Sequence, residues 1–316
     1  MSEGHTDLQT VKSPFAERWG AALGLFATAI IWATMVPFIA ALLPYFDPFL
    51  LSVLRYCLAL PVLAALVFLT EGQNPFNRHL NWTRMFILGV AMTGFSTFYT
   101  LGILYSDPLT AAVVLGLSPI MAAVLSWLMH RTPLSAPVYI AITMSVIGAM
   151  LVVQGAPSTS LSGSGSRGGE ILLVMATTCW SWYSLKVQAW FPAMSNLRVT
   201  TLTSATAIIW LMAMYGLFVA TGMAQLPIEI PGPGPIFMLI WVSWGAAGLA
   251  IVLWHHGTSR LGVPVATLYV NLIPVFAFIL SSFMFSIVPN AYQIVGGLVV
   301  LAGVALVQLN RLRNLS

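Results

Sequence analysis

The sequence predicts an all-α polytopic membrane protein in which ten transmembrane helices form two inverted repeats of five helices each. Three observations lead to this prediction: the composition, an internal repeat and the placement of charge. Hydrophobic residues make up 59% of the 316 residues and charged residues only 6%, whereas an ordinary soluble domain has roughly 25% charged residues. A spanning helix needs about 20 mostly apolar residues, and such segments fill nearly the whole sequence.

An internal repeat relates the two halves of the chain. When the stretch from Tyr99 to Val152 is shifted forward so that Gly102 falls on Gly257, it aligns without a gap on a later stretch. The same shift pairs Tyr99 with Trp254, Ala111 with Ala266, Leu117 with Leu272, Pro119 with Pro274, Ser126 with Ser281 and Gly148 with Gly303. Self-similarity at a fixed period indicates that the two halves fold alike.

The apolar segments define the expected spans in chain order. They lie at residues 20–43, 48–70, 84–105, 108–129, 136–154, 170–192, 197–221, 235–258, 264–286 and 289–309. Pro44, Asp47 and Pro48 separate the first two spans, and Asp107 with Pro108 makes a tight turn before the fourth. Proline cannot continue a helix and Asp favours turns, so these residues mark the boundaries.

The connection between the two halves is rich in Ser and Gly, which predicts a flexible linker. The predicted organisation is therefore a polar cytoplasmic tail at 1–19, a first repeat at 20–154, the linker at 155–169, a second repeat at 170–309 and a cytoplasmic tail at 310–316.

Charge predicts the orientation of the spans. If the amino terminus is cytoplasmic, the opposite side holds Arg167 as its only basic residue, and the near side holds Lys12, Arg18, Arg78, Arg84, Arg131, Arg198, Arg260, Arg311 and Arg313. Cytoplasmic loops carry an excess of Lys and Arg, so we expect both termini on the cytoplasmic side of a bacterial inner membrane. Because each half has an odd number of spans, the second half must cross the membrane in the opposite direction, as in inverted-repeat transporters.

The sequence contains none of the motifs that mark common enzyme or nucleotide sites, such as a phosphate loop, a zinc-binding His/Glu motif or a nucleophile elbow. Cys57 and Cys179 lie in apolar segments without metal-ligand spacing. We therefore expect no enzymatic activity, cofactor, metal or nucleic-acid partner. The expected partners are a small-molecule substrate and the lipid bilayer.

Short motifs in five of the spans resemble a known family. They are Ile31-Trp32-Ala33, Leu54-Arg55-Tyr56, Ser118-Pro119-Ile120, Cys179-Trp180-Ser181-Trp182-Tyr183 followed by Lys186, and Ile273-Pro274-Val275. In this order, within a plan of five plus five spans, residues 20–309 resemble the drug/metabolite transporter superfamily in its ten-span form with two EamA-type repeats. The resemblance implies a carrier of small metabolites that works by alternating access, often an exporter of amino acids or related compounds.

Aromatic residues are the main chemical indication of a binding site. The candidates are Trp32, Tyr99, Trp180, Tyr183 and Trp254. Trp32 and Trp180 lie near the middle of their spans, and Tyr183 shares a helical face with Trp180. Such a lining suits flat or apolar groups through stacking and cations through attraction to the ring faces. Packing or contact with lipid is the alternative role for each ring.

Polar and kinked positions add further candidates. Thr267, Asn271 and Pro274 recur on one helical face, where the amide and hydroxyl could line a cavity or bond to a neighbouring helix. Pro119 and Pro274 lie near mid-span and each removes a helix hydrogen bond. The resulting kinks could serve gating or packing, because broken helices at the midplane are typical of transporter sites.

Ionisable residues are rare inside the spans. Arg55 and Lys186 lie within them, whereas no Asp or Glu lies near mid-membrane. This argues against a carboxylate-based proton relay and against a permanently charged cation as the substrate. His255, beside His256 at the expected cytoplasmic end of the eighth span, is a candidate binding residue that can titrate near neutral pH.

The sequence thus favours a secondary transporter that exports an amino acid or a related zwitterion or amine through a central aromatic-lined cavity. A broad-specificity drug or quaternary amine carrier is the alternative, and a membrane-embedded enzyme or sensor built on the histidine pair is a more distant one. Gly148, Gly296, Gly297 and Gly303 leave room for close helix packing or a subunit contact. We expect a monomer or a weak homodimer.

Overall fold

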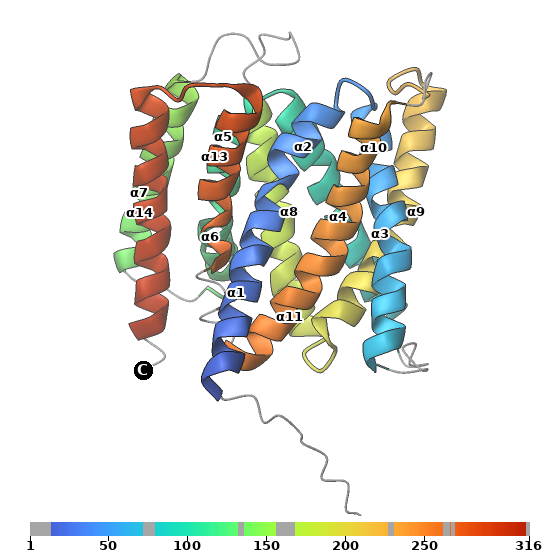
Figure 1. The fold of residues 1–316 in the computed structure, drawn as a ribbon, viewed down its shortest axis with the longest axis horizontal. Helices are drawn as coiled ribbons and strands as arrows, with labels where there is room; N and C mark the ends of the chain where they lie inside the picture. Colours follow the sequence, from blue (N-terminus) through green and yellow to red (C-terminus); the bar gives the residue numbers. More distant parts are fainter. Residues whose placement is uncertain are drawn as a thin grey trace, which may run out of the picture.

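The chain forms a bundle of helices in the computed structural model, which describes residues 14–71, 80–131, 136–155, 168–226, 231–261, 266 and 269–313 (Figure 1). Within these residues the structure is helical and contains no strand. The helices are α1 (Pro14–Ala33), α2 (Met35–Leu42), α3 (Pro48–Glu71), α4 (Trp82–Leu104), α5 (Pro108–Leu115), α6 (Ser118–His130), α7 (Ala136–Gly155), α8 (Gly169–Trp190), α9 (Asn196–Ala220), α10 (Pro233–Ile240), the π-helix η1 (Trp241–Leu249), α11 (Ala250–Leu261), α13 (Ile273–Phe285) and α14 (Ala291–Arg313).

Each of the ten predicted spans, where its residues are described, contains a helix or a broken helix. Among the described residues, six helical segments are long and apolar enough to cross a bilayer, and the bent pair Pro108–Leu115 with Ile120–Met129 makes a seventh. The prediction of an all-α polytopic membrane protein is confirmed. The beginning of α1 and the end of α14 lie at the same end of the bundle (Figure 1).

The repeats are inverted, as two contacts between α3 and its counterpart α9 demonstrate. Glu71 at the end of α3 accepts a hydrogen bond from Ser195, directly before α9. At the opposite end of the pair, Asp47 precedes α3 and accepts from the backbone N–H of Gln225, which follows α9. The start of each helix therefore lies beside the end of the other, so the two run antiparallel.

The last helices of the two repeats, α7 and α14, are also antiparallel and lie side by side in Figure 1. Gly155 at the end of α7 accepts a hydrogen bond of 2.6 Å from Asn290, directly before α14. At the crossing, a methyl group on Gly148 would lie 2.6 Å from the carbonyl oxygen of Gly296. These glycines therefore bring the two helices of one chain together.

The glycines that revealed the internal repeat occupy equivalent places in three dimensions. Gly102 of α4 packs against Leu173 of α8, and Gly257 of α11 packs against Leu25 of α1. In both cases the third span of one repeat meets the first span of the other through a glycine and a leucine. The repeat seen in the sequence is therefore a repeat of packing as well.

The predicted mid-span breaks are present. The fourth span is broken at Gly116 and Leu117 between α5 and α6 and bends there by 43°. Pro119 lies in the first turn of α6, and Pro274 lies in the first turn of α13 after the turn at Asn271. Proline is tolerated in a first turn, where its missing N–H leaves no bond unmade, so each proline starts a new half-helix.

Two more of the predicted spans are not regular helices. The first span breaks at Thr34, because Pro37 cannot donate to the carbonyl of Ala33 and its ring crowds that turn. The eighth span contains the nine-residue π-helix η1 between α10 and α11. The helices also extend beyond the apolar spans at the termini, since α1 begins at Pro14 and α14 ends at Arg313.

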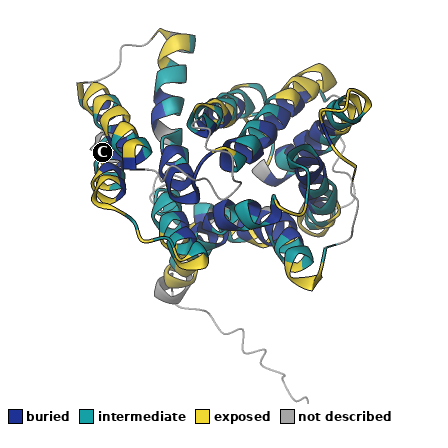
Figure 2. Ribbon diagram, turned by 90° about the horizontal axis from the view of Figure 1, so that it is seen from above, coloured by how far each residue is buried: buried dark blue, intermediate teal, exposed yellow. Residues whose placement is uncertain are grey.

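Burial follows the expectation for a bundle within lipid. Viewed from above, buried residues face the centre of the bundle and exposed residues face outward (Figure 2). The outward positions include large apolar side chains, such as Leu69 and Phe283 with 82% and 88% of their surface exposed. A soluble protein rarely exposes so much apolar surface, whereas acyl chains solvate it.

Candidate substrate cavity

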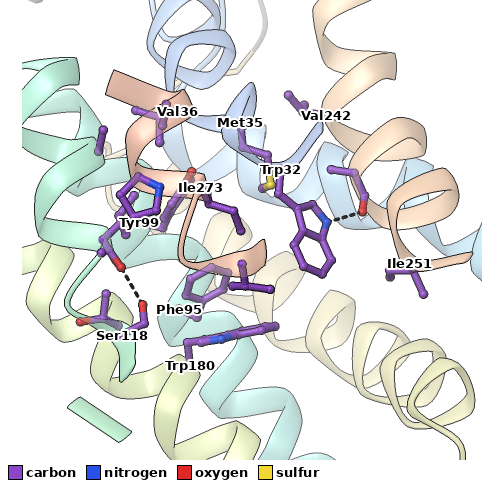
Figure 3. Close-up of a pocket in the computed structure, with 18 of the residues that line it drawn as sticks. Trp32, Met35, Val36, Phe95, Tyr99, Ser118, Trp180, Val242, Ile251 and Ile273 are labelled. Carbon is purple, nitrogen blue, oxygen red and sulfur yellow. Dashed lines mark hydrogen bonds between the residues drawn. The ribbon is translucent and has the colours of Figure 1, made fainter. Parts of the chain in front are cut away.

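A cavity of about 330 Å³ lies in the middle of the bundle (Figure 3). Its walls come from both repeats: the first repeat contributes α1, α2, α3, α4, α5 and the start of α6, and the second contributes α8, α9, η1, α11, α13 and α14. Most of the lining is apolar. The polar or aromatic lining residues are Trp32, Arg55, Tyr56, Phe95, Tyr99, Ser118, Thr177, Trp180, Thr200, Ser204 and Asn271.

Trp32 enters the cavity from the end of α1. Its Nε1 donates a hydrogen bond of 2.9 Å to the carbonyl oxygen of Ala246 in η1 (Figure 3). Its ring also contacts the ring of Trp254 on α11, with the centroids 5.8 Å apart. A hydrogen bond on one edge and a ring contact therefore fix the orientation of this indole.

Trp180 belongs to a row of rings supplied by α4 and α8. The centroid of Trp180 lies 5.2 Å from that of Phe95, which lies 5.4 Å from that of Tyr99. Phe95 and Tyr99 are four residues apart on α4, a spacing that places both on one helical face. The Trp180 side chain is 41% exposed, and its ring faces the cavity (Figure 3).

Tyr183 and Trp254 do not line the cavity but support the rings that do. Tyr183 is buried, its ring stacks on Trp180 at 5.7 Å, and its hydroxyl shares a hydrogen bond of 3.0 Å with Thr203. Trp254 makes the contact with Trp32 described above. Helical spacing placed Tyr183 on the face of Trp180, yet that face is wide enough for one ring to meet the cavity and the other to meet α9.

The remaining predicted residues divide into those that reach the cavity and those that cannot be placed. Asn271 and Pro274 line it, at the break before α13. Thr267 lies outside the described residues, as do the side chains of His255 and Pro119. The cavity therefore unites Trp32, Tyr99, Trp180, Asn271 and Pro274 from the predicted set.

Arg55 is the most important residue to which the sequence analysis assigned no role in the site. It lies on α3, is 6% exposed and lines the cavity. Its Nε and Nη1 atoms are buried without a hydrogen-bond partner, and its guanidinium carbon lies 5.7 Å from the centroid of the Tyr99 ring. The sequence did contain a signal, since charged residues inside membrane spans are rare and mark functional sites.

Phe95 was also missed. It stands one helical turn before Tyr99, so the face that places Tyr99 in the cavity also predicts Phe95 there. Its ring joins Tyr99 to Trp180.

The lining supplies groups that bind rather than a reactive constellation. Aromatic faces can stack on flat groups, the guanidinium can pair with an anion, and Ser118, Thr177 and Asn271 can form hydrogen bonds. No cluster of three or more His, Cys, Asp or Glu suited to a metal occurs in the part of the chain that the structure describes.

Comparison with known proteins identifies the family. The model of the EamA-like transporter family matches the chain twice, at residues 19–154 and 167–309. The chain belongs to the EamA-like transporter family. It is a multi-pass membrane transporter, and the resemblance noted in its sequence motifs to the drug/metabolite transporter superfamily is confirmed.

Curated relatives of this EamA-like transporter carry the same general description. The uncharacterized transporter YyaM of Bacillus subtilis (strain 168) is 23% identical over 82% of this chain and 84% of its own length. An uncharacterized transporter of Archaeoglobus fulgidus is 24% identical over 89% of this chain and 95% of its own length. A crystal structure with 19% identity covers 94% of this chain with a TM-score of 0.63, which supports the fold.

Proposed function

We propose that this transporter is a secondary carrier that exports an amino acid or a related zwitterion or amine by alternating access through the central cavity. The observation that carries the proposal is the cavity itself, which lies between two inverted repeats and receives an indole from each of them. Its volume of about 330 Å³ is at the lower end of the range for small-molecule sites. A small organic metabolite fits this size.

The architecture supports alternating access. Substrate sites of inverted-repeat transporters lie near the midplane, at the interface of the repeats and beside broken helices. Here the breaks before Pro119 and Pro274 lie close to the cavity, which Gly116 and Pro274 line directly. Rocking of one repeat against the other around these half-helices would open the cavity to either face.

The lining favours an amino acid over a quaternary amine or a cationic drug. Rings from α1, α4 and α8 attract flat or apolar side chains and also cations. However, no Asp or Glu is among the described residues that line the cavity, while Arg55 places a positive charge there. A permanent cation would meet repulsion without a compensating carboxylate.

The charges support a bacterial inner-membrane location with cytoplasmic termini. Arg84 lies in the first turn of α4, Arg198 at the start of α9 and Arg260 at the end of α11. These helix ends lie at the end of the bundle that holds the termini (Figure 1). Asp47 and Asp107 lie at the other end. This distribution follows the positive-inside rule, and we propose that the carrier acts there as a monomer or weak homodimer.

Reconstitution into liposomes tests the proposal. Purified protein is assayed with a panel of labelled amino acids and amines, and saturable flux of at least one amino acid is expected. Empty liposomes and a variant with Trp127→Ala, an indole on α6 that does not line the cavity, serve as controls. Absence of saturable flux across the whole panel would contradict the proposed function.

A further inference from the structure

We propose that Arg55 is a substrate-binding residue that pairs with a carboxylate of the transported molecule. The inference rests on the proposed function and narrows it. The substrate is then an amino acid or organic acid whose free carboxylate lies next to an apolar or aromatic group, and simple amines are excluded.

The first argument is that Arg55 carries an unsatisfied charge. A guanidinium remains protonated in proteins and has five N–H donors. Nevertheless the Nε and Nη1 atoms of Arg55 are buried without a hydrogen-bond partner, in the middle of an apolar bundle. A buried charge without a partner is strongly unfavourable, so its presence calls for a ligand that completes it.

No carboxylate among the described residues neutralises this charge. Asp47, at the start of the same helix, is already engaged: one carboxylate oxygen accepts from the N–H groups of Phe49 and Leu50, and the other accepts from Gln225. Arg55 lies eight residues after Asp47, a rise of about 12 Å along the helix. The ring of Tyr99 contacts the guanidinium. A ring face attracts a cation, but it does not accept hydrogen bonds from the N–H groups that lie in the plane of the guanidinium.

The second argument is the place of Arg55 in the aromatic row. The guanidinium lies over Tyr99 at one end of the row, and Phe95 and Trp180 continue it along the cavity wall. A molecule with a carboxylate at one end and a flat or apolar group at the other matches both features at once. The planar fork of arginine binds carboxylates through two parallel hydrogen bonds.

The chemistry of the cavity favours a carboxylate over a phosphate. Arg55 is the only Lys or Arg among the described residues that line the cavity, and one guanidinium balances a single negative charge. A phosphate carries between one and two negative charges near pH 7, and the rest of the wall is mostly apolar.

Matched pairs of compounds test the inference in the intact protein. L-phenylalanine, L-tryptophan and L-leucine are each compared with their carboxamides, which differ in the carboxylate alone. Ligand-induced thermal shifts and flux into proteoliposomes are measured for the wild type, Arg55→Gln and Arg55→Lys. Arg84→Gln is the control, because Arg84 also lies over an indole, that of Trp190 at 5.5 Å, but outside the cavity.

We expect the wild type to respond to an acid at a concentration about tenfold or more below that of its amide, because a tenfold ratio corresponds to one good charged contact. Arg55→Gln should remove this preference, Arg55→Lys should retain part of it, and Arg84→Gln should leave it unchanged. Without ligand, Arg55→Gln should melt at or above the wild-type temperature, since it removes a buried unpaired charge.

Two results overturn the role of Arg55 while leaving the carrier intact: amides that bind the wild type as well as acids do, or an acid preference that persists in Arg55→Gln. A lower melting temperature for empty Arg55→Gln would assign Arg55 to packing with Tyr99 and also count against the inference. If that variant fails to fold, the comparison of acid with amide in the wild type still decides. Failure of every acid and every amide would instead overturn the proposed function.

Discussion

The third spans of the two repeats make equivalent contacts but differ in their secondary structure. In the first repeat it is α4, a single regular helix, and in the second it is α10, η1 and α11, with nine residues of π-helix in the middle. Both spans pack against the first span of the opposite repeat, Gly102 against Leu173 and Gly257 against Leu25. Because these contacts are equivalent, the differences between the two spans at the cavity can be attributed to the binding site.

At the cavity, α4 contributes aromatic side chains, whereas η1 contributes the small apolar residues Val242 and Ala246 and a backbone carbonyl that holds Trp32. Phe95 and Tyr99 present rings from α4, whereas the backbone carbonyl of Ala246 in η1 accepts the hydrogen bond from Trp32. The indole N–H of Trp241, at the start of η1, donates to the hydroxyl of Thr34. Segments of π-helix occur often at functional sites. The helix-packing contacts are therefore common to the two repeats, whereas the groups that line the cavity differ between them.

The largest expected effect comes from removing the indole that extends the α4 wall. Trp180→Ala should lower the flux of the transported amino acid about tenfold, because a stacking partner worth about 0.5–1.5 kcal/mol is lost together with the apolar area that it buries. The measurement is initial flux in liposomes, with folded protein verified by size-exclusion chromatography. Trp127→Ala provides the reference, and equal flux in the two variants would contradict the assignment.

The equivalence of the two glycine contacts predicts an intermediate effect. Gly102→Ala and Gly257→Ala should each destabilise the protein by about 1–3 kcal/mol, because a new methyl group overlaps a leucine side chain in both cases. Thermal unfolding in detergent measures this.

The matched control for the glycine variants is Gly216→Ala on α9. A methyl group there meets no atom within 4 Å, so this change should raise stability by about 0.5–1 kcal/mol. If only one of Gly102 and Gly257 proved sensitive, the two third spans would not be equivalent.

The smallest expected effect is a difference in stability between variants of Trp32, which bonds to η1, and of Trp180, which stacks beside α4. Trp32→Phe keeps a ring but leaves the carbonyl of Ala246 without its side-chain donor, so stability should fall by about 1 kcal/mol. Trp180→Phe removes no hydrogen bond of this kind and should be milder. Parallel unfolding curves test the difference. A larger loss of stability for Trp180→Phe than for Trp32→Phe would contradict the stabilising role assigned to the hydrogen bond between Trp32 and Ala246.

Much of the fold follows from sequence because its physical causes are local. Apolar length predicts the spans, and Pro119 and Pro274 predict the mid-span breaks, because a proline cannot continue the helix that precedes it. Pro37 carries the same information about the break at Thr34, but it stands inside one continuous apolar segment, which by itself predicts a regular span. The π-helix η1 has no such signal in the sequence, since no proline lies within it.

The site was predictable only where spacing alone determines direction. The cavity is lined by Trp32, Tyr99, Trp180 and Asn271. Tyr183 does not line it, because its hydroxyl is hydrogen-bonded to Thr203 of the neighbouring helix α9. Arg55 was visible as a charge within a span, but its sequence depth is equally compatible with a side chain that reaches the interface. Only packing places its guanidinium beside Tyr99 without a hydrogen-bond partner.

Access to the cavity from both sides tests the central claim most directly. Ser118 lines the cavity, so a Ser118→Cys variant without Cys57 and Cys179 can be labelled by a thiol reagent that does not cross membranes. We predict labelling from either face of oriented vesicles, slowed from both by the transported amino acid. Labelling from one face alone, or labelling that this amino acid does not slow, would contradict a substrate cavity that opens alternately between two inverted repeats.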